Sequence, residues 1–369
     1  MTDRLRLVTG TAGVLASLRR SLASDGVTAP LPPGEPERGR TLAMLRPETP
    51  AEQPAAAAIL ATSGSTGRPR GVVLSAPALR ASAEATHARL DGPGSWVLAL
   101  PPHYVAGLMV LVRALVAGTA MREVDPQLEG LTGLQLPGTG PHYLSLVPTQ
   151  LVRALADPSQ AAALRRYAAV LVGGAAADPA LLSRASEAGI RVVTTYGMSE
   201  TCGGCVYEGV PLDGVEVTVT AGGRLTVGGP VLFSGYRLDP AATGEALVGG
   251  RLLTRDRGTV RDGRVEVLGR VDDVVQSGGL NVDLAVVERA VQAWAGDAEA
   301  AVVGVPHPEW GTEVVAVLSE GSLDDLRTTL AADLPPYALP RRLVRRTLPR
   351  TAGGKIDRRR LVTELQEAP

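Results

Sequence analysis

An alternation of short apolar runs with helical patterns between residues 56 and 195 restricts the fold more than any other feature. Each run of apolar residues is followed by glycines or prolines and then by a segment with helical periodicity. This alternation predicts parallel β-α-β units, in which ligands bind beyond the carboxyl ends of the strands. The strands are expected at 95–100, 143–147, 168–172 and 191–195, and the helices at 105–116, 148–156 and 179–188.

Two other patterns follow along the chain. Brief alternating segments separated by Gly and Asp turns predict an antiparallel β-rich subdomain, with strands at 215–219, 224–227, 251–254 and 264–268. The last hundred residues or so predict a compact α+β domain, with helices at 283–294 and 323–333 and strands at 300–305, 313–318 and 341–347. We therefore expect a large α/β domain over residues 1–270, followed by a small α+β domain over 271–369.

The N-terminal region and the composition give further limits. Residues 1–25 favour an amphipathic helix over a signal peptide, and residues 27–53, rich in Pro, Glu and Arg, predict loop or loosely packed surface. No run of ~18 apolar residues occurs, which argues against a membrane span. A net charge of −1 argues against nucleic-acid binding, and two cysteines favour a reducing, cytoplasmic setting.

Residues 56–75 read as a strand, a glycine-rich loop and a second strand, which we interpret as a phosphate cradle. Glycines bring backbone N–H groups close to an anion, and hydroxyls add donors. The loop residues concerned are Thr62, Ser63, Gly64, Ser65, Thr66, Gly67 and Gly71. The chain lacks the Lys-Ser or Lys-Thr of a P-loop NTPase and the glycine spacing of a dinucleotide-binding fold. A Ser/Gly-rich surface turn is the alternative interpretation.

Three further segments carry a family resemblance. They are T-T-Y-G-M-S-E-T at 194–201, G-R-V-D-D-V-V-Q-S-G-G-L-N-V at 269–282 and L-P-R-T-A-G-G-K-I-D at 348–357. Together with the glycine loop they make the chain similar to the adenylate-forming superfamily of acyl-CoA ligases, firefly luciferases and nonribosomal adenylation domains, from about residue 56 onward. The resemblance implies an α/β large domain, a mobile α+β small domain, and ATP, Mg²⁺ and CoA as cofactor and cosubstrates. The resemblance does not decide whether the protein forms a homodimer.

The resemblance also implies roles for single residues. Thr62 to Gly67 would bind the pyrophosphate of ATP, and Asp272 would be the hinge. Gly174, Ala175 and Tyr196 would border the adenine, Asp256 and Arg270 would bind the ribose, Thr201 would touch the α-phosphate, and Glu200 would hold Mg²⁺. Solvated turn residues are the alternative interpretation for Glu200 and Asp256.

Lys355 is the only lysine among the 37 basic Lys and Arg residues of the chain. A compact ammonium can sit between oxygens of two different molecules better than a planar guanidinium can. The catalytic lysine of the family falls on Lys355, where it would bridge the substrate carboxylate and the α-phosphate.

The chain departs from the family pattern in three places. Arg70 stands where a lysine is usual, and His103-Tyr104 replaces the usual order of an aromatic residue before histidine. The segment before the glycine loop is also shorter than in most members. His103, Tyr104, Ser199, Gly203 and Gly204 are candidates for the acyl pocket, although His103 also fits a partly buried wall residue. For Cys202 and Cys205 we favour small wall residues over a redox or zinc site.

The segment C-G-G-C-V-Y-E-G-V-P-L-D-G at 202–214 resembles short actinobacterial-type o-succinylbenzoate–CoA ligases of menaquinone synthesis. This resemblance implies a small-molecule carboxylic acid, ATP and CoA as ligands, and conversion of o-succinylbenzoate to its CoA thioester through an acyl-AMP. The alternatives are a general aryl- or acyl-CoA ligase and a non-catalytic nucleotide sensor.

Overall fold

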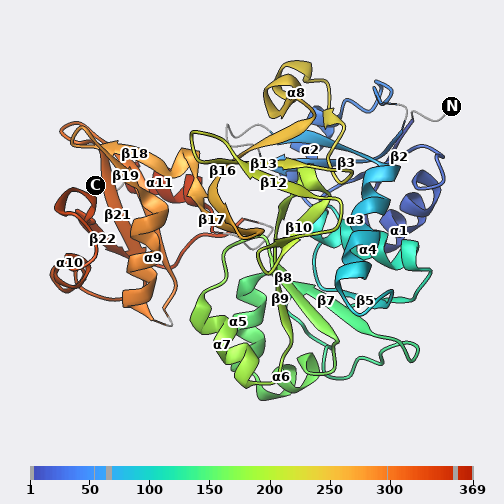
Figure 1. The fold of residues 1–369 in the computed structure, drawn as a ribbon, viewed down its shortest axis with the longest axis horizontal. Coiled ribbons are helices and arrows are strands. Elements are labelled where there is room, and N and C mark those ends of the chain that lie inside the picture. The colour runs from blue at the N-terminus through green and yellow to red at the C-terminus, as the bar shows by residue number, and fades with distance from the viewer. Residues whose placement is uncertain (1–3, 54, 64–68, 297, 352–355, 368–369) are drawn as a thin grey trace. The chain divides into compact units, whose positions relative to one another are not determined.

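The computed structural model describes residues 4–53, 55–63, 69–296, 298–351 and 356–367 (Figure 1). The chain divides into two compact units. The large unit comprises residues 1–218, 226–254 and 260–265, and the small unit comprises residues 219–225, 255–259 and 266–369. The domain boundary at 270/271 remains a prediction.

The predicted β-α-β region forms a seven-stranded sheet with the order β11-β10-β9-β8-β7-β5-β6. Its pairs from β6 to β9 are parallel, as predicted, and β10 runs antiparallel to β9. Its strands are β5 (Ser95–Leu98), β6 (Met121–Glu123), β7 (His142–Leu146), β8 (Ala169–Gly173), β9 (Val192–Met198), β10 (Gly203–Tyr207) and β11 (Val210–Pro211). The helices that connect them are α4 (Val105–Ala117), α5 (Pro148–Ala156), α6 (Pro158–Leu164) and α7 (Pro179–Glu187).

The helices of this region cover the sheet in the way that their apolar faces predict. Leu151 of α5 and Leu181 of α7 share a buried core with Leu146 and Val170 of the sheet. Figure 1 shows α5, α6 and α7 together beside β7, β8 and β9, and α4 beside α3 (Ala76–Arg89). A parallel sheet buried in this way leaves the carboxyl ends of its strands for ligands.

A second sheet has the order β1-β2-β3-β4-β14, and it contradicts one expectation. Its strands are β1 (Leu5–Val8), β2 (Val27–Pro30), β3 (Ala56–Ser63), β4 (Pro69–Ser75) and β14 (Gly235–Tyr236), with α1 (Gly10–Ser21) and α2 (Glu37–Leu45) beside them. The N-terminal helix is confirmed as α1. The prediction of loop or loose surface at 27–53 is wrong, because β2 is buried throughout and α2 buries Thr41 and Leu45.

Arg237 explains how the segment 45–52 is held in place. Its side chain is 0% exposed and donates hydrogen bonds to the backbone carbonyls of Leu45, Arg46, Thr49 and Pro50, and it lies 3.5 Å from Glu52. A buried guanidinium supplies five donors in a fixed arrangement, so it can satisfy several carbonyls at once. Order in this segment therefore depends on a residue far away in the sequence.

A third sheet has the order β12-β13-β16-β15, and β17 pairs with β16. It is formed by the segments for which the sequence predicted a β-rich subdomain, with β15 antiparallel to β16. Its strands are β12 (Glu216–Val219), β13 (Arg224–Gly228), β15 (Leu247–Val248), β16 (Arg251–Arg261) and β17 (Arg264–Arg270), and α8 (Pro240–Ala246) precedes β15.

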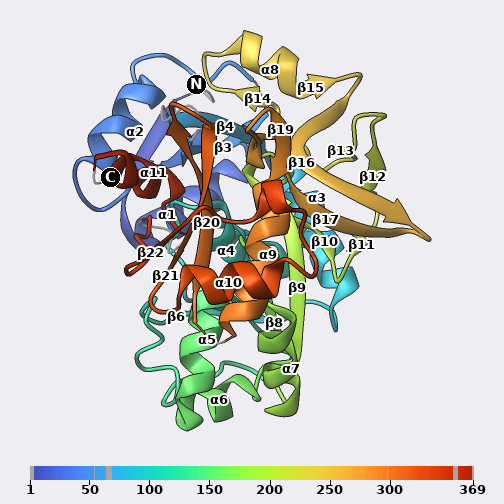
Figure 2. The same ribbon diagram turned by 90° about the vertical axis from the view of Figure 1, so that its left-hand side faces the viewer.

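The small unit contains the predicted α+β arrangement (Figure 2). Its sheet has the order β19-β18-β21-β20, and β22 pairs with β21. The α9 and α10 helices share one core with the sheet, and α11 packs in another core. The elements are β18 (Val274–Ser277), β19 (Leu280–Asp283), α9 (Leu284–Ala295), β20 (Ala300–His307), β21 (Gly311–Leu318), α10 (Leu323–Leu330), β22 (Arg342–Arg345) and α11 (Arg358–Glu367).

Short 3-10 turns occur at Ser199–Thr201, Val271–Asp273 and Pro336–Ala338. Within the described ranges, every helix is too short or too polar to traverse a bilayer.

Candidate active site

The strands that flank the glycine-rich loop are those predicted. β3 and β4 pair antiparallel, with Thr62 opposite Arg70, and the Thr62 hydroxyl donates to the Arg70 carbonyl at 3.3 Å. Gly71 is required by close packing, because a Cβ there would lie 2.7 Å from the Cβ of Arg237. Gly64, Ser65, Thr66 and Gly67 lie outside the described residues, and so their assignment to pyrophosphate remains a prediction.

The T-T-Y-G-M-S-E-T segment forms the end of β9 and a 3-10 turn at Ser199–Thr201. The buried Thr201 hydroxyl accepts from the Met198 N–H at 2.9 Å and lies 2.7 Å from the Gly203 carbonyl. Cys202 and Gly203 then adopt left-handed backbone conformations, with φ of 52° and 83°. Thr201 thus holds a sharp turn between β9 and β10, and its contact with an α-phosphate remains a prediction.

Glu200 is fixed at two points by the segment that leads into β14. The Phe233 N–H donates to the Glu200 carbonyl at 2.8 Å, and the Tyr236 hydroxyl donates to Glu200 Oε1 at 2.8 Å. Burial, followed by the charge of Glu200, raises the pKa of Tyr236, which keeps its proton available to the carboxylate. The Arg70 guanidinium lies 5.2 Å from the centre of the Tyr236 ring.

Glu200 also fits the chemistry that a magnesium ion requires. No cluster of three or more potential metal ligands occurs among the described residues. Mg²⁺ commonly binds through one or two carboxylates together with substrate phosphates and water, so one anchored carboxylate suffices. Glu200 is therefore a chemically suitable ligand for Mg²⁺ that arrives with a nucleotide.

The residues predicted to border adenine lie at one edge of the seven-stranded sheet. Gly174 and Ala175 are exposed directly after β8, and Tyr196 is part of the neighbouring strand β9. Gly173 pairs with Thr195, so the two segments lie side by side. This is the carboxyl end of parallel strands, where the sequence analysis expected a ligand.

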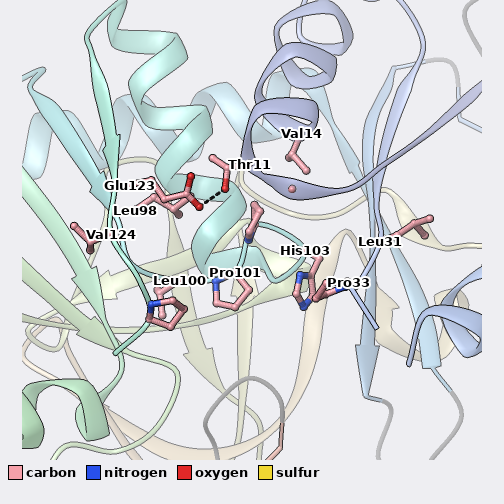
Figure 3. A pocket seen from close by; sticks show the side chains of 13 residues that line it. Thr11, Val14, Leu31, Pro33, Leu98, Leu100, Pro101, His103, Glu123 and Val124 are labelled. Carbon is pink, nitrogen blue, oxygen red and sulfur yellow. Dashed lines mark hydrogen bonds between the residues drawn. The ribbon is translucent and has the colours of Figure 1, made fainter. Parts of the chain in front are cut away.

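His103 and Tyr104 precede α4, and their surroundings differ. The Tyr104 hydroxyl donates to Glu37 at 2.9 Å, and burial lowers the pKa of His103. His103 lines a mainly apolar cavity of about 230 Å³, together with Thr11 and Glu123, which share a hydrogen bond (Figure 3). None of the other predicted site residues lines this cavity.

Gly203 and Gly204 are the first two residues of β10, and Gly203 faces α4. A Cβ on Gly203 would be 3.4 Å from Met109, and one on Gly204 would be 3.0 Å from the ring of Tyr207. Cys202 and Cys205 are free and buried, and burial raises the pKa of both thiols, that of Cys205 to about 11. Burial of this kind disfavours reactive thiolates.

Sequence reasoning missed Arg113, which lies one helical turn beyond Met109 on the same face of α4. It is 4% exposed, its Nη2 donates to the Tyr207 hydroxyl at 3.3 Å, and its guanidinium lies 5.0 Å from the Trp96 ring. Across the described residues it has no carboxylate partner, and its Nε has no hydrogen bond. The signal was present in the sequence, since Arg113 is the one charged residue of V-A-G-L-M-V-L-V-R-A-L-V-A.

Two neighbours of Arg113 also carry buried polar atoms that have no hydrogen-bond partner among the described residues. These atoms are Nε2 of His87 and Nε1 of Trp96. Burial, followed by the charge of Arg113, lowers the pKa of His87 to about 4, so His87 is neutral at neutral pH. The cluster of Arg113, His87 and Trp96 therefore carries one positive charge and unused hydrogen-bonding capacity.

In the small unit, the predicted ribose and hinge residues lie close together. Arg270 Nη1 is 3.9 Å from Asp256 Oδ1, and the Asp256 side chain is 13% exposed. Asp272 forms ion pairs with Arg255 at 2.9 Å and with Arg270 at 3.5 Å. Lys355 lies outside the described residues, although Arg350 and Ile356 on either side of it pair in an antiparallel bridge.

Comparisons with known proteins identify the family to which the chain is similar. A family described as "AMP-binding enzyme" matches residues 10–261, and one described as "AMP-binding enzyme C-terminal domain" matches residues 286–355. A Mycobacterium tuberculosis protein named "Probable 2-succinylbenzoate--CoA ligase" is 44% identical over 322 residues, which cover 83% of this chain and 84% of that protein. The "2-succinylbenzoate--CoA ligase" of Enterococcus faecalis is 29% identical, over 87% of this chain and 72% of the relative.

A solved structure extends the likeness to the fold. It is the wild-type E. coli MenE with a bound m-phenylether-linked analogue of OSB-AMS, and it aligns with a TM-score of 0.77 at 26% identity. The alignment covers 99% of this chain and 88% of the other.

Proposed function

The chain belongs to the AMP-binding enzyme family, and we propose that it is an ATP-dependent acid–CoA ligase that converts 2-succinylbenzoate (o-succinylbenzoate) to its CoA thioester, a step of menaquinone synthesis. The carboxylate of the succinyl chain attacks the α-phosphorus of ATP, and the products are acyl-AMP and pyrophosphate. The thiol of CoA then attacks the acyl carbonyl and displaces AMP. No covalent enzyme intermediate is needed.

Different residues of the chain have different roles in the first step, the formation of acyl-AMP. The glycine-rich loop binds the leaving pyrophosphate, and Lys355 stabilises the charge that builds up between the carboxylate and the α-phosphate. Glu200 would hold Mg²⁺, which supplies positive charge to the phosphates when it is bound. Gly174, Ala175 and Tyr196 border the adenine, and Asp256 and Arg270 hold the ribose.

Between the two steps, the small domain rotates about Asp272. A hinge residue of this kind absorbs the backbone change that brings a second set of groups to the same intermediate. Within the described ranges, the Asp272 side chain forms ion pairs with Arg255 and Arg270, all at exposed positions, and such pairs are weak, about 0–1 kcal/mol each. Little free energy therefore opposes a change of conformation at this residue.

The observation that carries the choice of acid is the buried, incompletely bonded Arg113. 2-Succinylbenzoate has two carboxylates, and the aromatic one stays ionised while the other reacts. A buried carboxylate is costly unless a cation and hydrogen-bond donors meet it. Among the described residues, Arg113 has an Nε donor without a hydrogen bond and no carboxylate partner, and Trp96 Nε1 offers a second donor.

The position of Arg113 also suits this role. Gly203 faces Met109, which lies one turn before Arg113 on α4. Gly204 faces Tyr207, whose hydroxyl accepts a hydrogen bond from Arg113. Arg113 thus lies immediately behind the wall that Gly203 and Gly204 form. A side chain at either glycine would press on Met109 or Tyr207, the residues next to Arg113, so glycine at both positions keeps these surroundings of the guanidinium in place.

Acid-dependent exchange of labelled pyrophosphate into ATP tests this proposal. 2-Succinylbenzoate should support exchange at least about 100-fold better, in kcat/KM, than 4-oxo-4-phenylbutanoate, which keeps the ring and the succinyl chain but lacks the aromatic carboxylate. Benzoate and a medium-chain fatty acid should be poorer still. If a monoacid matched 2-succinylbenzoate, a general acyl-CoA ligase would replace the proposed function, and a nucleotide sensor would show no exchange with any acid.

A further inference from the structure

We propose that Tyr236 is a positioning residue for the adenylation step, which holds the Glu200 carboxylate in one rotamer and ties it to the exit strand of the glycine-rich loop. The inference rests on the proposed function, because it concerns the metal and nucleotide of that reaction. Neither residue of β14 was singled out by the sequence motifs. The structure assigns the role through three contacts.

The first contact fixes the carboxylate itself. Glu200 Oε1 accepts the Tyr236 hydroxyl at 2.8 Å, and within the described part of the chain Oε2 has no partner. One carboxylate oxygen is therefore occupied by the protein, and the other is left to face a cation. Without the tyrosine hydroxyl, the glutamate side chain would be free to rotate among its rotamers.

The second contact fixes the backbone of the same residue. The Phe233 N–H donates to the Glu200 carbonyl at 2.8 Å, and the rings of Phe233 and Tyr236 pack edge to face with centroids 4.9 Å apart. Backbone and carboxylate of Glu200 are thus both held by residues 233–236. A residue held at both ends keeps its carboxylate in a defined place relative to the turn.

The third contact links this assembly to the loop. Tyr236 pairs with Val72 and Gly235 with Val73 of β4, the strand that leaves the glycine-rich loop. Arg70 on the same strand places its guanidinium 5.2 Å from the Tyr236 ring centre. A continuous series of contacts therefore runs from Glu200, the predicted metal ligand, through Tyr236 to Arg70 on the strand that follows the predicted phosphate cradle.

The substitution Tyr236→Phe tests the role because it removes the hydroxyl and keeps the ring. The apparent affinity for the divalent cation in pyrophosphate exchange should fall about 10-fold to 100-fold, the usual result of losing a group that orients a metal ligand. The maximal rate at saturating Mg²⁺ should change less than about threefold, because the reacting groups are unchanged. A purely structural tyrosine would instead leave the Mg²⁺ dependence as it is.

A binding measurement gives a second readout that needs no turnover. Mn²⁺ binding to the enzyme in the presence of ATP, followed by electron paramagnetic resonance, should weaken by the same factor in Tyr236→Phe. Tyr167→Phe removes the hydroxyl of a buried tyrosine elsewhere in the large unit and should leave binding unchanged. In a Glu200→Gln background, Tyr236→Phe should cause no further loss, because the two changes act on one interaction.

Equal Mn²⁺ affinity in the wild type and Tyr236→Phe would overturn the inference, as would a full additional loss in the Glu200→Gln background. These outcomes are separate from failure of the proposed function. If the wild type showed no acid-dependent exchange, the ligase assignment would fall, and the Mn²⁺·ATP measurement would still decide the role of Tyr236.

Discussion

Two arginines are buried among the described residues of the large unit, and one forms far more hydrogen bonds than the other. Arg237, on the segment after β14, has four backbone carbonyls and Glu52 around a fully buried side chain. Arg113, on α4, donates one hydrogen bond to Tyr207 and lies against the face of Trp96, and its Nε has no partner in the described part of the chain. Both carry a full positive charge away from water.

The difference distinguishes a structural cation from one whose bonding within the described fold is incomplete, and we propose that the second binds a ligand. Burying a charge is costly unless it is paired and hydrogen-bonded, and Arg237 meets that condition within the fold. Arg113 does not meet it with any described residue, so the protein carries the cost in its free state. An anionic ligand that reaches Arg113 recovers part of that cost, which ties the free energy of binding to one ionised group of the substrate.

The largest effect on stability is expected from Arg237→Ala. Loss of the guanidinium removes hydrogen bonds to four backbone carbonyls, of which that of Arg46 keeps the Thr49 N–H as a donor. We expect the unfolding free energy to fall by about 3–5 kcal/mol, as when one partner of a buried pair is removed. Denaturant unfolding followed by circular dichroism measures this. Arg153→Ala, at an exposed position of α5, is the matched control. A loss below about 1 kcal/mol would show that these contacts contribute little.

Arg113→Met should have the next largest effect, on substrate choice instead of stability. The exchange reaction with 2-succinylbenzoate should lose about 100-fold in kcat/KM, or about 2.7 kcal/mol, while 4-oxo-4-phenylbutanoate changes little. Stability should be unchanged or higher, because an unpaired buried charge is replaced by an apolar chain of similar size. Arg153→Met serves as the control. Equal losses with both acids would remove Arg113 from the recognition of the second carboxylate.

The smallest effect is expected from Glu52→Gln. The Glu52 side chain is 35% exposed and lies 3.5 Å from Arg237, while its Oε1 accepts the Leu238 N–H, a bond that glutamine can keep. Only the charge is lost, so stability should fall by about 0.5 kcal/mol, and less at high salt. A loss comparable with that of Arg237→Ala would mean that the carboxylate, and not the carbonyls, satisfies the arginine.

Much of the fold was predictable because helices and strands are indicated by patterns within short stretches of sequence. The α5 helix begins and ends where its periodicity predicted, and α4 and α7 differ from their predictions by one residue at the C-terminal end. The prediction for residues 27–53 was wrong because contacts with residues far away in the sequence hold part of this segment in place. Arg237, which satisfies the carbonyls of residues 45–50, is almost 190 residues further along the chain. No local propensity can report such a contact.

The candidate site shows the same limit. Motifs identified Glu200 and Thr201 by residue type, yet they did not reveal that Thr201 bonds to the turn or that Tyr236 holds Glu200. Arg113 was overlooked because the sequence does not show whether the single charged residue of an apolar helix is buried or exposed. Lys355 and most of the glycine-rich loop lie outside the described residues, and their roles remain predictions from motif resemblance.

The two-residue strand β14 has a consequence for how this chain tolerates insertions and deletions. Tyr236 ends the strand and Arg237, directly after it, still bonds to β4 through its N–H and the Gly71 carbonyl. Neighbouring residues of an extended segment point to opposite faces, so Tyr236 reaches Glu200 while Arg237 reaches four carbonyls between residues 45 and 50. Removing or adding one residue between Phe233 and Gly235 would exchange the two faces and bring the arginine to the glutamate and the tyrosine to the carbonyls. We expect homologous chains to vary in length in the loops around this segment but not within it, and engineered grafts to keep residues 233–237 as one block.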